Sequence, residues 1–291
     1  MKWPPFAYLR AGSLDDVWRA QADYGPGAQL VAGGQTLLAT LAFRLSEPSI
    51  LVDITRVPEL AGITLGDGAL RIGALTRHAE LGRDPLVARH APLLVQAVPL
   101  IAHPAIRNRG TIGGSLAYAD PAAELPACIV ALDATLVLCS PRGQRRVPAR
   151  DFFTGLFETA LQADELIAAV EVPCATPATR VAIDEVARRS GDYAMAGLAA
   201  CLTLGADGVV ASPRLVCFGV GTGPVSAGRA AAALAGRPLT QESIASATAA
   251  LDGDLDPPAD LHGPPEMKLH LVRVLLRRTL TRFLPAQENA A

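Results

Sequence analysis

The chain has 291 residues, of which 50% are hydrophobic and 19% are charged, and its formal net charge at pH 7 is −2. This composition is typical of a folded globular protein rather than a disordered one. The small net charge gives no electrostatic reason to expect a nucleic-acid partner. The length predicts about two domains, at roughly 150 residues each.

The cysteines exclude most metal and disulfide sites. All are widely spaced, no CxxC or paired Cys/His spacing occurs, and their number is odd; they are Cys128, Cys139, Cys174, Cys201 and Cys217. We therefore predict buried free thiols and no metal bound by this chain, in a reducing cytoplasm. The N-terminus shows no secretory signal, and no apolar run approaches the ~18 residues that a membrane span needs.

The first elements suggest a β-α-β arrangement. Ser13 is expected to cap a helix that begins at Leu14, with Asp15 and Asp16 at its positive end. A strand at Ala28–Ala32, a helix at Gln35–Leu45 and a strand at Ile50–Ile54 are expected to follow. A Rossmann fold with Asp53 as the ribose-binding acid is an alternative. It is disfavoured because the sequence GGQT lacks the G-x-G-x-x-G spacing.

The middle of the chain predicts hairpins and short helices. Ile63–Ala74 is expected to form a hairpin around Gly-Asp-Gly, and Thr135–Cys139 is expected to pair with Gln144–Val147. Thr76 is expected to cap a short helix. Pro85–Ala102 is expected to be mostly helical. A helix with proline at its first position is expected at Pro121–Leu132, and a strand is expected at Leu166–Val172.

The stretch Pro173–Pro177 is the best candidate for a domain boundary, because two prolines flank a short polar run. It gives a first domain of residues 1–176, with lobes of about 1–57 and 58–176, and a second domain of residues 177–291. In the second domain we expect three antiparallel strands and three helices. The strands are Arg180–Ala187, Leu198–Leu204 and Val209–Val220, and the helices are Ser226–Ala235, Gln241–Leu251 and Glu266–Leu284.

The last of these helices is amphipathic. Leu269, Val272 and Leu276 share one face, while the basic residues are expected to lie mostly elsewhere; these are Lys268, Arg273, Arg277, Arg278 and Arg282. A helix docked on its own domain is the simplest interpretation, and contact with a partner subunit is the alternative.

Two Gly-Gly turns are the most informative feature. Leu30–Leu37 (LVAGGQTL) contains Gly33 and Gly34, and the segment from Ile106 to Pro126 contains Gly113 and Gly114 between Thr111 and Ser115. Adjacent glycines let backbone N–H groups surround an anion and adopt positive φ. Two such turns suit a diphosphate held from both sides, although two purely structural turns are an equally good explanation of this pattern.

Other candidate residues allow two interpretations each. Asp120 and Glu124 form a carboxylate pair, for which helix capping and ligand positioning are better explanations than acid–base catalysis. Arg107 and Arg109 either neutralise phosphate or are structural, and Tyr193 taken alone is more often a core residue than a cofactor contact. No nucleophile or zinc spacing is present, so no catalytic residue is assigned.

Three segments carry a resemblance to a known family. The segments AGGQTLL at Ala32–Leu38, IRNRGTIGGSLAYADPAAELP at Ile106–Pro126 and RRSGDYAMAG at Arg188–Gly197 occur in this order. They resemble the signatures of the FAD-binding medium subunit of molybdenum hydroxylases, a family that includes the carbon monoxide dehydrogenase medium subunit and the xanthine dehydrogenase FAD domain. The similarity extends from about Pro5 to about Leu284.

The resemblance implies an α+β fold, with a two-lobed FAD-binding (PCMH-type) domain followed by a smaller domain of antiparallel sheet and helices. It implies an oxidoreductase subunit that binds FAD non-covalently and carries electrons. The implied partners are a large subunit with a molybdenum–pterin cofactor and a small subunit with 2Fe–2S clusters, assembled as a dimer of heterotrimers. Electrons would pass from the iron–sulfur clusters through the flavin to a terminal acceptor.

The resemblance also implies roles for single residues. The acid at Glu124 contacts the sugar–phosphate part of the flavin nucleotide, Tyr193 lies against the isoalloxazine, and Ile101 and Leu166 pack around that ring. The candidate cofactor-binding residues are therefore Leu30, Val31, Ala32, Gly33, Gly34, Gln35, Thr36, Leu37, Ile101, Thr111, Ile112, Gly113, Gly114, Ser115, Glu124, Leu166 and Tyr193.

This chain departs from the family pattern at three positions. Asp184 stands where xanthine dehydrogenase relatives carry a lysine near the flavin, which weakens the case for NAD as acceptor. Thr36 replaces the commoner serine, and Tyr118 stands where histidine is usual. The alternative function is a stand-alone FAD oxidoreductase similar to the vanillyl-alcohol-oxidase type. It is disfavoured because no flavin-linking His or Cys adjoins either turn and the second domain is small for a substrate cap.

Overall fold

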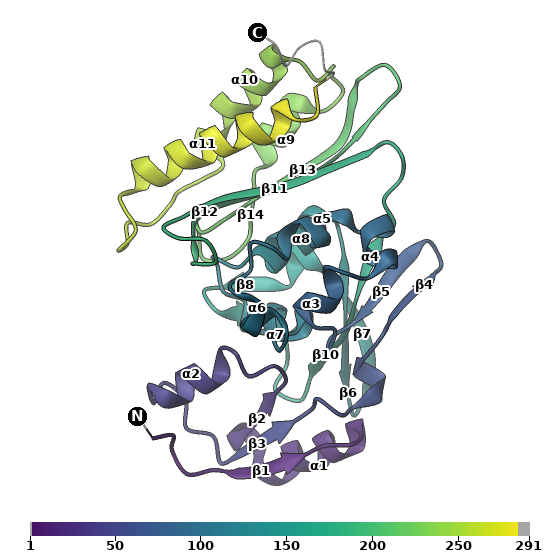
Figure 1. Cartoon of the computed structure of the whole chain (residues 1–291), viewed down its shortest axis with the longest axis vertical. Helices are drawn as coiled ribbons and strands as arrows, with labels where there is room; N and C mark the ends of the chain where they lie inside the picture. Colours follow the sequence, from purple (N-terminus) through teal and green to yellow (C-terminus); the bar gives the residue numbers. More distant parts are fainter. Residues whose placement is uncertain (1, 285–291) are drawn as a thin grey trace.

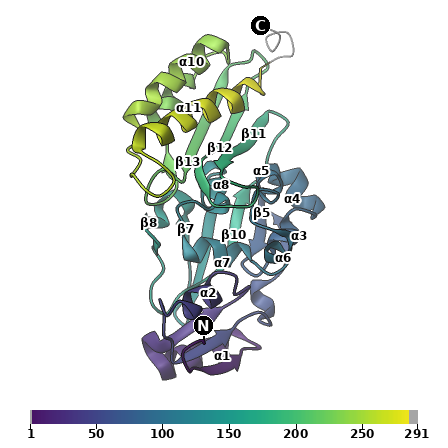
Figure 2. The same cartoon turned by 60° about the vertical axis from the view of Figure 1, so that its left-hand side comes forward.

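Three sheets are stacked along the long axis of the molecule in the computed structural model, which describes residues 2–284 (Figure 1). The N-terminal sheet lies at one end, a five-stranded sheet lies in the middle, and a four-stranded sheet covered by helices lies at the other end. The same order is visible after rotation (Figure 2). The α+β fold class predicted from the sequence is confirmed.

The N-terminal sheet is parallel, with strand order β1-β3-β2. Its elements are β1 Ala7–Arg10, α1 Leu14–Tyr24, β2 Ala28–Val31, α2 Leu37–Ala42 and β3 Ile50–Asp53. The predicted cap of α1 is confirmed, because Ser13 Oγ accepts from the Asp16 N–H at 3.3 Å and Asp16 Oδ2 accepts from the Ser13 N–H at 3.1 Å. Asp53 accepts the Tyr8 hydroxyl at 2.5 Å.

The middle sheet is antiparallel, with order β4-β5-β10-β6-β7, and both predicted hairpins are confirmed. Its strands are β4 Ile63–Gly66, β5 Ala69–Gly73, β6 Thr135–Ser140, β7 Gly143–Pro148 and β10 Leu166–Pro173. The short ribbon consists of β8 Phe153–Gly155 and β9 Glu158–Thr159. The helices are α3 His78–Leu81, α4 Pro85–His90, α5 Pro92–Ala97, α6 Pro104–Arg107, α7 Ile112–Tyr118 and α8 Glu124–Ala131.

Three expectations about the helices are wrong in detail. The expected helix at Gln35–Leu45 is only α2, because the glycine turn continues to Thr36. Thr76 is not a cap, since α3 begins after Arg77, whose backbone N–H donates to Glu80 Oε2 at 2.7 Å. Pro85–Ala102 is mostly helical, as expected, and is divided into α4 and α5, with Pro92 at the start of α5.

The third correction concerns α8, which begins at Glu124 and not at Pro121. Asp120 Oδ1 accepts from the Ala122 N–H at 2.9 Å, and the Asp120 carbonyl accepts from the Ala123 N–H at 3.1 Å. These two bonds fold residues 120–123 into a turn, because an aspartate side chain can replace the backbone acceptor that a helix would use.

The C-terminal sheet is antiparallel, with order β11-β12-β13-β14, as expected for its three long strands. Its strands are β11 Thr179–Ala187, β12 Ala194–Leu204, β13 Val210–Phe218 and β14 Val225–Ser226. The three predicted helices are confirmed as α9 Gly228–Leu234, α10 Gln241–Ala250 and α11 Pro265–Thr281. Pro173 is the last residue of β10, residues 174–177 lie between β10 and β11, and the domain boundary placed there stays a prediction.

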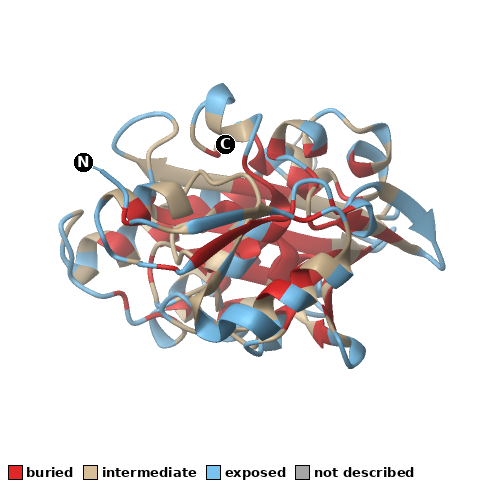
Figure 3. Cartoon of the chain, turned by 90° about the horizontal axis from the view of Figure 1, so that it is seen from below, coloured by how far each residue is buried: buried red, intermediate tan, exposed pale blue. Residues whose placement is uncertain are grey.

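Helix α8 joins the middle and C-terminal layers. All of its residues are buried, and its side chains share one core cluster with residues of β5, β10, β12 and β13. A second cluster lies between the C-terminal sheet and α9–α11, and a third lies between the N-terminal and middle sheets. Figure 3 shows the buried residues concentrated along the interior of these layers. Four cysteines are buried and Cys174 is half-buried, and all five are free thiols, as predicted.

Lys268 is the clearest error in the prediction for α11. Its side chain is only 1% exposed, and Nζ donates to Asp260 Oδ2 at 2.5 Å and to the Gly219 carbonyl at 3.3 Å. Val272 and Leu276 are fully buried, as predicted. Within residues 2–284, no helix combines the length and the apolar character that crossing a bilayer requires.

Candidate functional site

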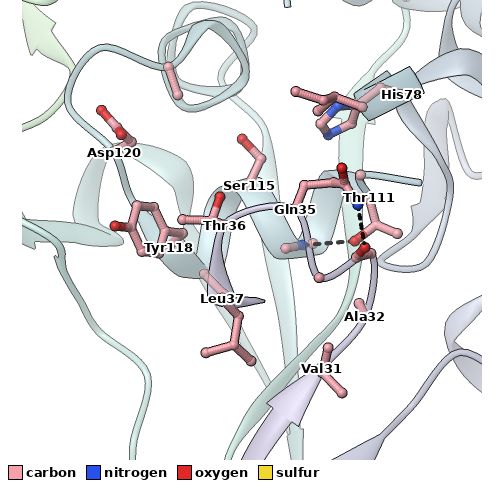
Figure 4. A pocket seen from close by; sticks show the side chains of 18 of the residues that line it. Val31, Ala32, Gln35, Thr36, Leu37, His78, Thr111, Ser115, Tyr118 and Asp120 are labelled. Carbon is pink, nitrogen blue, oxygen red and sulfur yellow. Dashed lines mark hydrogen bonds between the residues drawn. The ribbon is translucent and has the colours of Figure 1, made fainter. Parts of the chain in front are cut away.

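A cavity of about 820 Å³ lies where the N-terminal lobe, the middle layer and the loop before β12 meet. Its wall includes the turn after β2, the segment that contains α7, the turn before α8, the start of β10 and the loop Gly191–Tyr193. Figure 4 shows side chains from several of these segments converging on the opening. A volume of this size is in the range of small-molecule and cofactor sites, about 300–1,000 Å³.

The predicted site residues are brought together with one exception. Sixteen of them line the cavity, from both glycine turns as well as Ile101, Glu124, Leu166 and Tyr193. Ile112 does not line it, because its side chain is fully buried in the core of the middle layer. Whether these residues bind a cofactor stays a prediction.

The first glycine turn presents free backbone donors. In the part of the chain that the structure describes, the N–H groups of residues 33–37 donate to no acceptor of the protein. Gly34 has φ +71°, and Gln35 Nε2 donates to the Gly33 carbonyl at 2.9 Å, which fixes the turn. Successive free N–H groups around a residue of positive φ form an anion-binding concavity.

The second glycine turn is different, and the expectation that its N–H groups are free is wrong. Gly113 N–H donates to the Ala74 carbonyl at 2.9 Å, and Gly114 N–H donates to Thr111 Oγ1 at 3.1 Å. The N–H groups of Ile112 and Ser115 are also paired, with backbone carbonyls of Thr76 and Thr111. What this turn offers the cavity is the hydroxyl groups of Thr111 and Ser115.

The two turns pack directly against each other. A Cβ added to Gly33 would lie 2.2 Å from the Arg109 carbonyl oxygen, and one added to Gly113 would lie 2.6 Å from Ala74 Cβ. Distances this short forbid any side chain at either position, so one glycine of each pair is needed for close packing. The other glycines, Gly34 and Gly114, line the cavity without such a backbone clash.

Four charged residues considered from the sequence lie outside the cavity wall. Arg107 Nη1 donates to the carbonyls of Ile101 and Ala102 at 2.8 and 2.9 Å, which supports its structural interpretation. Arg109 contributes its backbone to the packing of the turns. Asp53 bonds to its neighbours in the N-terminal lobe, and Asp184 pairs with Arg278 of α11 and with Arg282, which directly follows α11.

Acidic groups and tyrosines gather at one part of the wall. Burial raises the pKa of Glu124 to about 7, and burial also raises the pKa of Asp120. The Tyr118 ring lies 5.2 Å from the Phe157 ring between centroids. Tyr193 lines the same cavity and is 59% exposed, so it is not a core residue.

Several wall residues were not predicted, among them His78, Phe157 and Leu161. His78 comes to the wall because its backbone N–H pairs with the Gly110 carbonyl at 3.0 Å. Phe157 and Leu161 are brought there by the β8–β9 ribbon, which carries no motif. None of these residues has a local sequence signal, because long-range contacts place them.

We expect the ligand-free chain to become less stable as the pH rises from about 5 to about 8. Burial raises the pKa of Glu124 to about 7 and that of Glu185 to about 8, so the folded chain retains protons that the unfolded chain has released. The stabilisation is complete below their ordinary pKa values and is lost as the pH rises from there to the raised values, by on the order of 3 kcal/mol for Glu124. Urea unfolding at several pH values measures it.

The matched variant for this measurement is Glu124→Gln, which keeps the side-chain shape but cannot ionise. It should flatten the slope of unfolding free energy against pH. A slope equal to that of the wild-type chain would show that the buried carboxyl of Glu124 does not hold a proton.

Comparison with known proteins extends over almost the whole chain. The family described as "FAD binding domain in molybdopterin dehydrogenase" matches residues 4–175, and the one described as "CO dehydrogenase flavoprotein C-terminal domain" matches residues 181–283. The alpha subunit of the 6-hydroxypseudooxynicotine dehydrogenase complex of Paenarthrobacter nicotinovorans is 42% identical, over 98% of this chain and 96% of the relative.

Solved structures show the same similarity. A chain of quinoline 2-oxidoreductase from Pseudomonas putida 86 superposes with a TM-score of 0.91 at 39% identity, covering 97% of this chain and 98% of that chain. A chain of carbon monoxide dehydrogenase from Hydrogenophaga pseudoflava superposes with a TM-score of 0.93 at 36% identity, covering 96% and 97%.

Proposed function

We propose, because this chain belongs to the family of FAD-binding medium subunits of molybdenum hydroxylases, that it holds one FAD non-covalently in the cavity and carries electrons for a larger oxidoreductase. When bound, FAD supplies an exchange between single-electron donors such as iron–sulfur centres and a two-electron acceptor. The observation that carries the proposal is the run of free backbone N–H groups at residues 33–37 on the cavity wall.

The residues present fit a dinucleotide with a diphosphate. Charged phosphate oxygens need several donors, and a hydrogen bond to a charged group contributes about 1.5–3 kcal/mol. The first glycine turn supplies backbone donors, while Thr111 and Ser115 supply hydroxyl groups from the facing turn. The absent Cβ atom at Gly33 lets the first turn pack directly against the backbone of Arg109 and Gly110, just before the second turn.

Other wall residues suit the remaining parts of the cofactor. Ile101, Leu166 and Tyr193 give the cavity an apolar and aromatic surface, which suits a flat flavin ring. Glu124 is placed to accept hydrogen bonds from sugar hydroxyls. These roles agree with those that the family resemblance implies.

The proposed partners are a large subunit with a molybdenum–pterin cofactor and a small subunit with 2Fe–2S clusters, in a dimer of heterotrimers. In this arrangement the iron–sulfur subunit delivers electrons to the site of this chain, and a terminal acceptor removes them. Support comes from the relatives, which are named as a subunit of a dehydrogenase complex and a medium chain of carbon monoxide dehydrogenase. The buried thiols suit a cytoplasmic location.

Acid precipitation of the purified protein is expected to release all of its yellow colour into the supernatant. No cysteine of the chain lines the cavity, and His78, the histidine that does line it, is only 6% exposed, so a covalent flavin link is not expected. Absorbance of the supernatant and pellet measures the outcome, with one FAD per chain. FMN, which lacks the diphosphate, should bind much more weakly, and colour retained in the pellet would contradict the proposal.

A further inference from the structure

The side chain of Arg145, in β7, closes the loop of residues 160–165, which joins β9 to β10. Its Nη2 donates to the Ala160 carbonyl at 2.6 Å, at the start of the loop. At the end of the loop, Nε and Nη2 donate to Glu165 Oε1 and Oε2 at 2.6 and 2.7 Å. Two parallel hydrogen bonds between a guanidinium and a carboxylate are strong and fix the orientation of both groups. Arg145 therefore holds both ends of the loop.

This loop belongs to the cavity wall. Leu161, Glu165 and the adjoining Leu166 line the cavity, and the side chain of Glu165 is only 4% exposed. Glu165 Oε2 also accepts from the Gln162 N–H at 2.9 Å, so the carboxylate anchors the loop from inside. The hydrogen bond from Arg145 is the main effect that lowers the pKa of Glu165. A carboxylate this buried needs a counter-charge, and Arg145 supplies it.

The next residue of β7 makes the same kind of pair away from the cavity. Arg146 Nε and Nη2 donate to Glu171 Oε2 and Oε1 at 3.0 and 3.2 Å. Successive side chains of a strand point to opposite faces of the sheet. On the face of Arg145, the register places Leu138 beside it and Ile167 of the cavity wall beside Leu138. Neither Arg146 nor Glu171 lines the cavity.

The loop has a second ionic contact on its outer side. Arg142 Nη2 donates to Asp164 Oδ1 at 3.0 Å, but the two side chains are 62% and 36% exposed. Ion pairs between exposed side chains contribute little to stability. The buried pair of Arg145 and Glu165 is therefore the ionic contact that decides the position of this part of the wall.

We propose that Arg145 is a positioning residue of the cofactor site, which holds the loop of residues 160–165 in the form that binds FAD. The inference rests on the proposed function, because FAD is the ligand assigned to the cavity. Arg145 does not line the cavity, so it acts through Glu165 and its apolar neighbours on the wall. The flavin ring is the part of FAD that should respond, since Leu166 is assigned to that ring.

The test compares Arg145→Gln with Arg146→Gln in the full chain freed of FAD. Arg145→Gln leaves the Glu165 carboxylate buried without its counter-charge, whereas Arg146→Gln breaks the pair on the other face of the sheet. Titration with FAD, followed by quenching of flavin fluorescence, should show about tenfold weaker binding in Arg145→Gln and wild-type affinity in Arg146→Gln. Arg145→Lys keeps the charge but not the two parallel bonds, and it should recover part of the loss.

Two further measurements separate a positioning role from a general loss of stability. The visible absorption spectrum of FAD bound at saturation should shift in Arg145→Gln and not in Arg146→Gln, because lower stability alone leaves the surroundings of the ring in the folded chain unchanged. In the FAD-free chain, the amides of Gln162 and Glu165 are hydrogen-bonded within the loop. Their hydrogen exchange should be faster in Arg145→Gln than in Arg146→Gln.

Equal FAD affinity and equal spectra in the two variants would overturn the inference, as would equal exchange at Gln162. If Arg145→Gln yields no folded protein, Glu165→Gln takes its place, since it keeps the side-chain shape and removes the charge. It should show a smaller loss of FAD affinity, and wild-type affinity there would count against the inference. A wild-type chain that fails to bind FAD would overturn the proposed function, and the exchange measurement, which needs no FAD, would still decide whether Arg145 holds the loop.

Discussion

Gly34→Ala is expected to reduce the affinity of the FAD-free chain for FAD at least a hundredfold, while most of the fold remains intact. Gly34 has φ +71°, where an L-residue with a Cβ is strained by roughly 1–2 kcal/mol. The added Cβ would also lie 3.1 Å from Leu38 Cδ1. Relief of this strain rotates the neighbouring N–H groups away from the cavity, and each hydrogen bond lost to a phosphate oxygen costs about 1.5–3 kcal/mol. Titration with FAD, followed by quenching of flavin fluorescence, measures the loss.

The matched control is Gly68→Ala in the β4–β5 hairpin. Gly68 has φ +74° and nothing within 4 Å of its Cβ position, so it reproduces the backbone strain far from the cavity. This control should lose stability and keep its affinity for FAD. Near-native affinity in Gly34→Ala would show that the first glycine turn is a structural turn and not a phosphate-binding one.

The sequence predicts the elements whose signals are local. Ser13 and Asp16 form the expected capping box, and the sequence Gly66-Asp67-Gly68 forms the expected hairpin turn between β4 and β5. The two glycine turns were found for the same reason, because adjacent glycines beside hydroxyl residues are visible without knowledge of the fold. Almost every site residue derived from these turns lies on the cavity wall.

The wrong predictions concern residues whose hydrogen bonds and burial depend on contacts with residues distant in the sequence. The N–H group of Gly113 donates to the Ala74 carbonyl, and that of Ile112 donates to the Thr76 carbonyl. The N–H groups of the second turn are therefore hydrogen-bonded to a segment distant in the sequence and are not free, contrary to the prediction. Lys268 can be buried because Asp260 and the Gly219 carbonyl accept hydrogen bonds from its ammonium group. No sequence pattern within α11 contains that information.

His78 shows the same limit at the site itself. In the sequence it is one histidine in a short helical segment without a partner at metal spacing. Its place on the cavity wall follows from burial and from the Gly110 backbone beneath the ring, neither of which a local pattern expresses. Sites that topology assembles are therefore the part of function that a single sequence predicts least well.

The isolated chain is expected to oxidise no substrate of the complete complex, and substrate should bleach its flavin only after both partner subunits are added. In the proposed complex, substrate is oxidised at the metal centre of a partner subunit, where a metal ion can polarise the substrate and activate water. Among residues 2–284, no group of three or more His, Cys, Asp or Glu side chains is arranged to hold a metal ion. Anaerobic mixing of the FAD-loaded chain with aldehydes, purines and carbon monoxide, followed at the oxidised flavin band, measures this difference.

The decisive comparison is between the chain alone and the chain reconstituted with the iron–sulfur and molybdenum subunits. Reduction of the flavin by an artificial donor, such as dithionite, checks that the isolated chain is competent, so a lack of bleaching by substrate then reflects the missing partners. Stoichiometric bleaching of the isolated chain by any of these substrates would favour the alternative, a stand-alone FAD oxidoreductase. The cavity would then have to admit substrate beside the flavin ring, and Tyr193 at 59% exposure would be the first wall residue to test for contact with it.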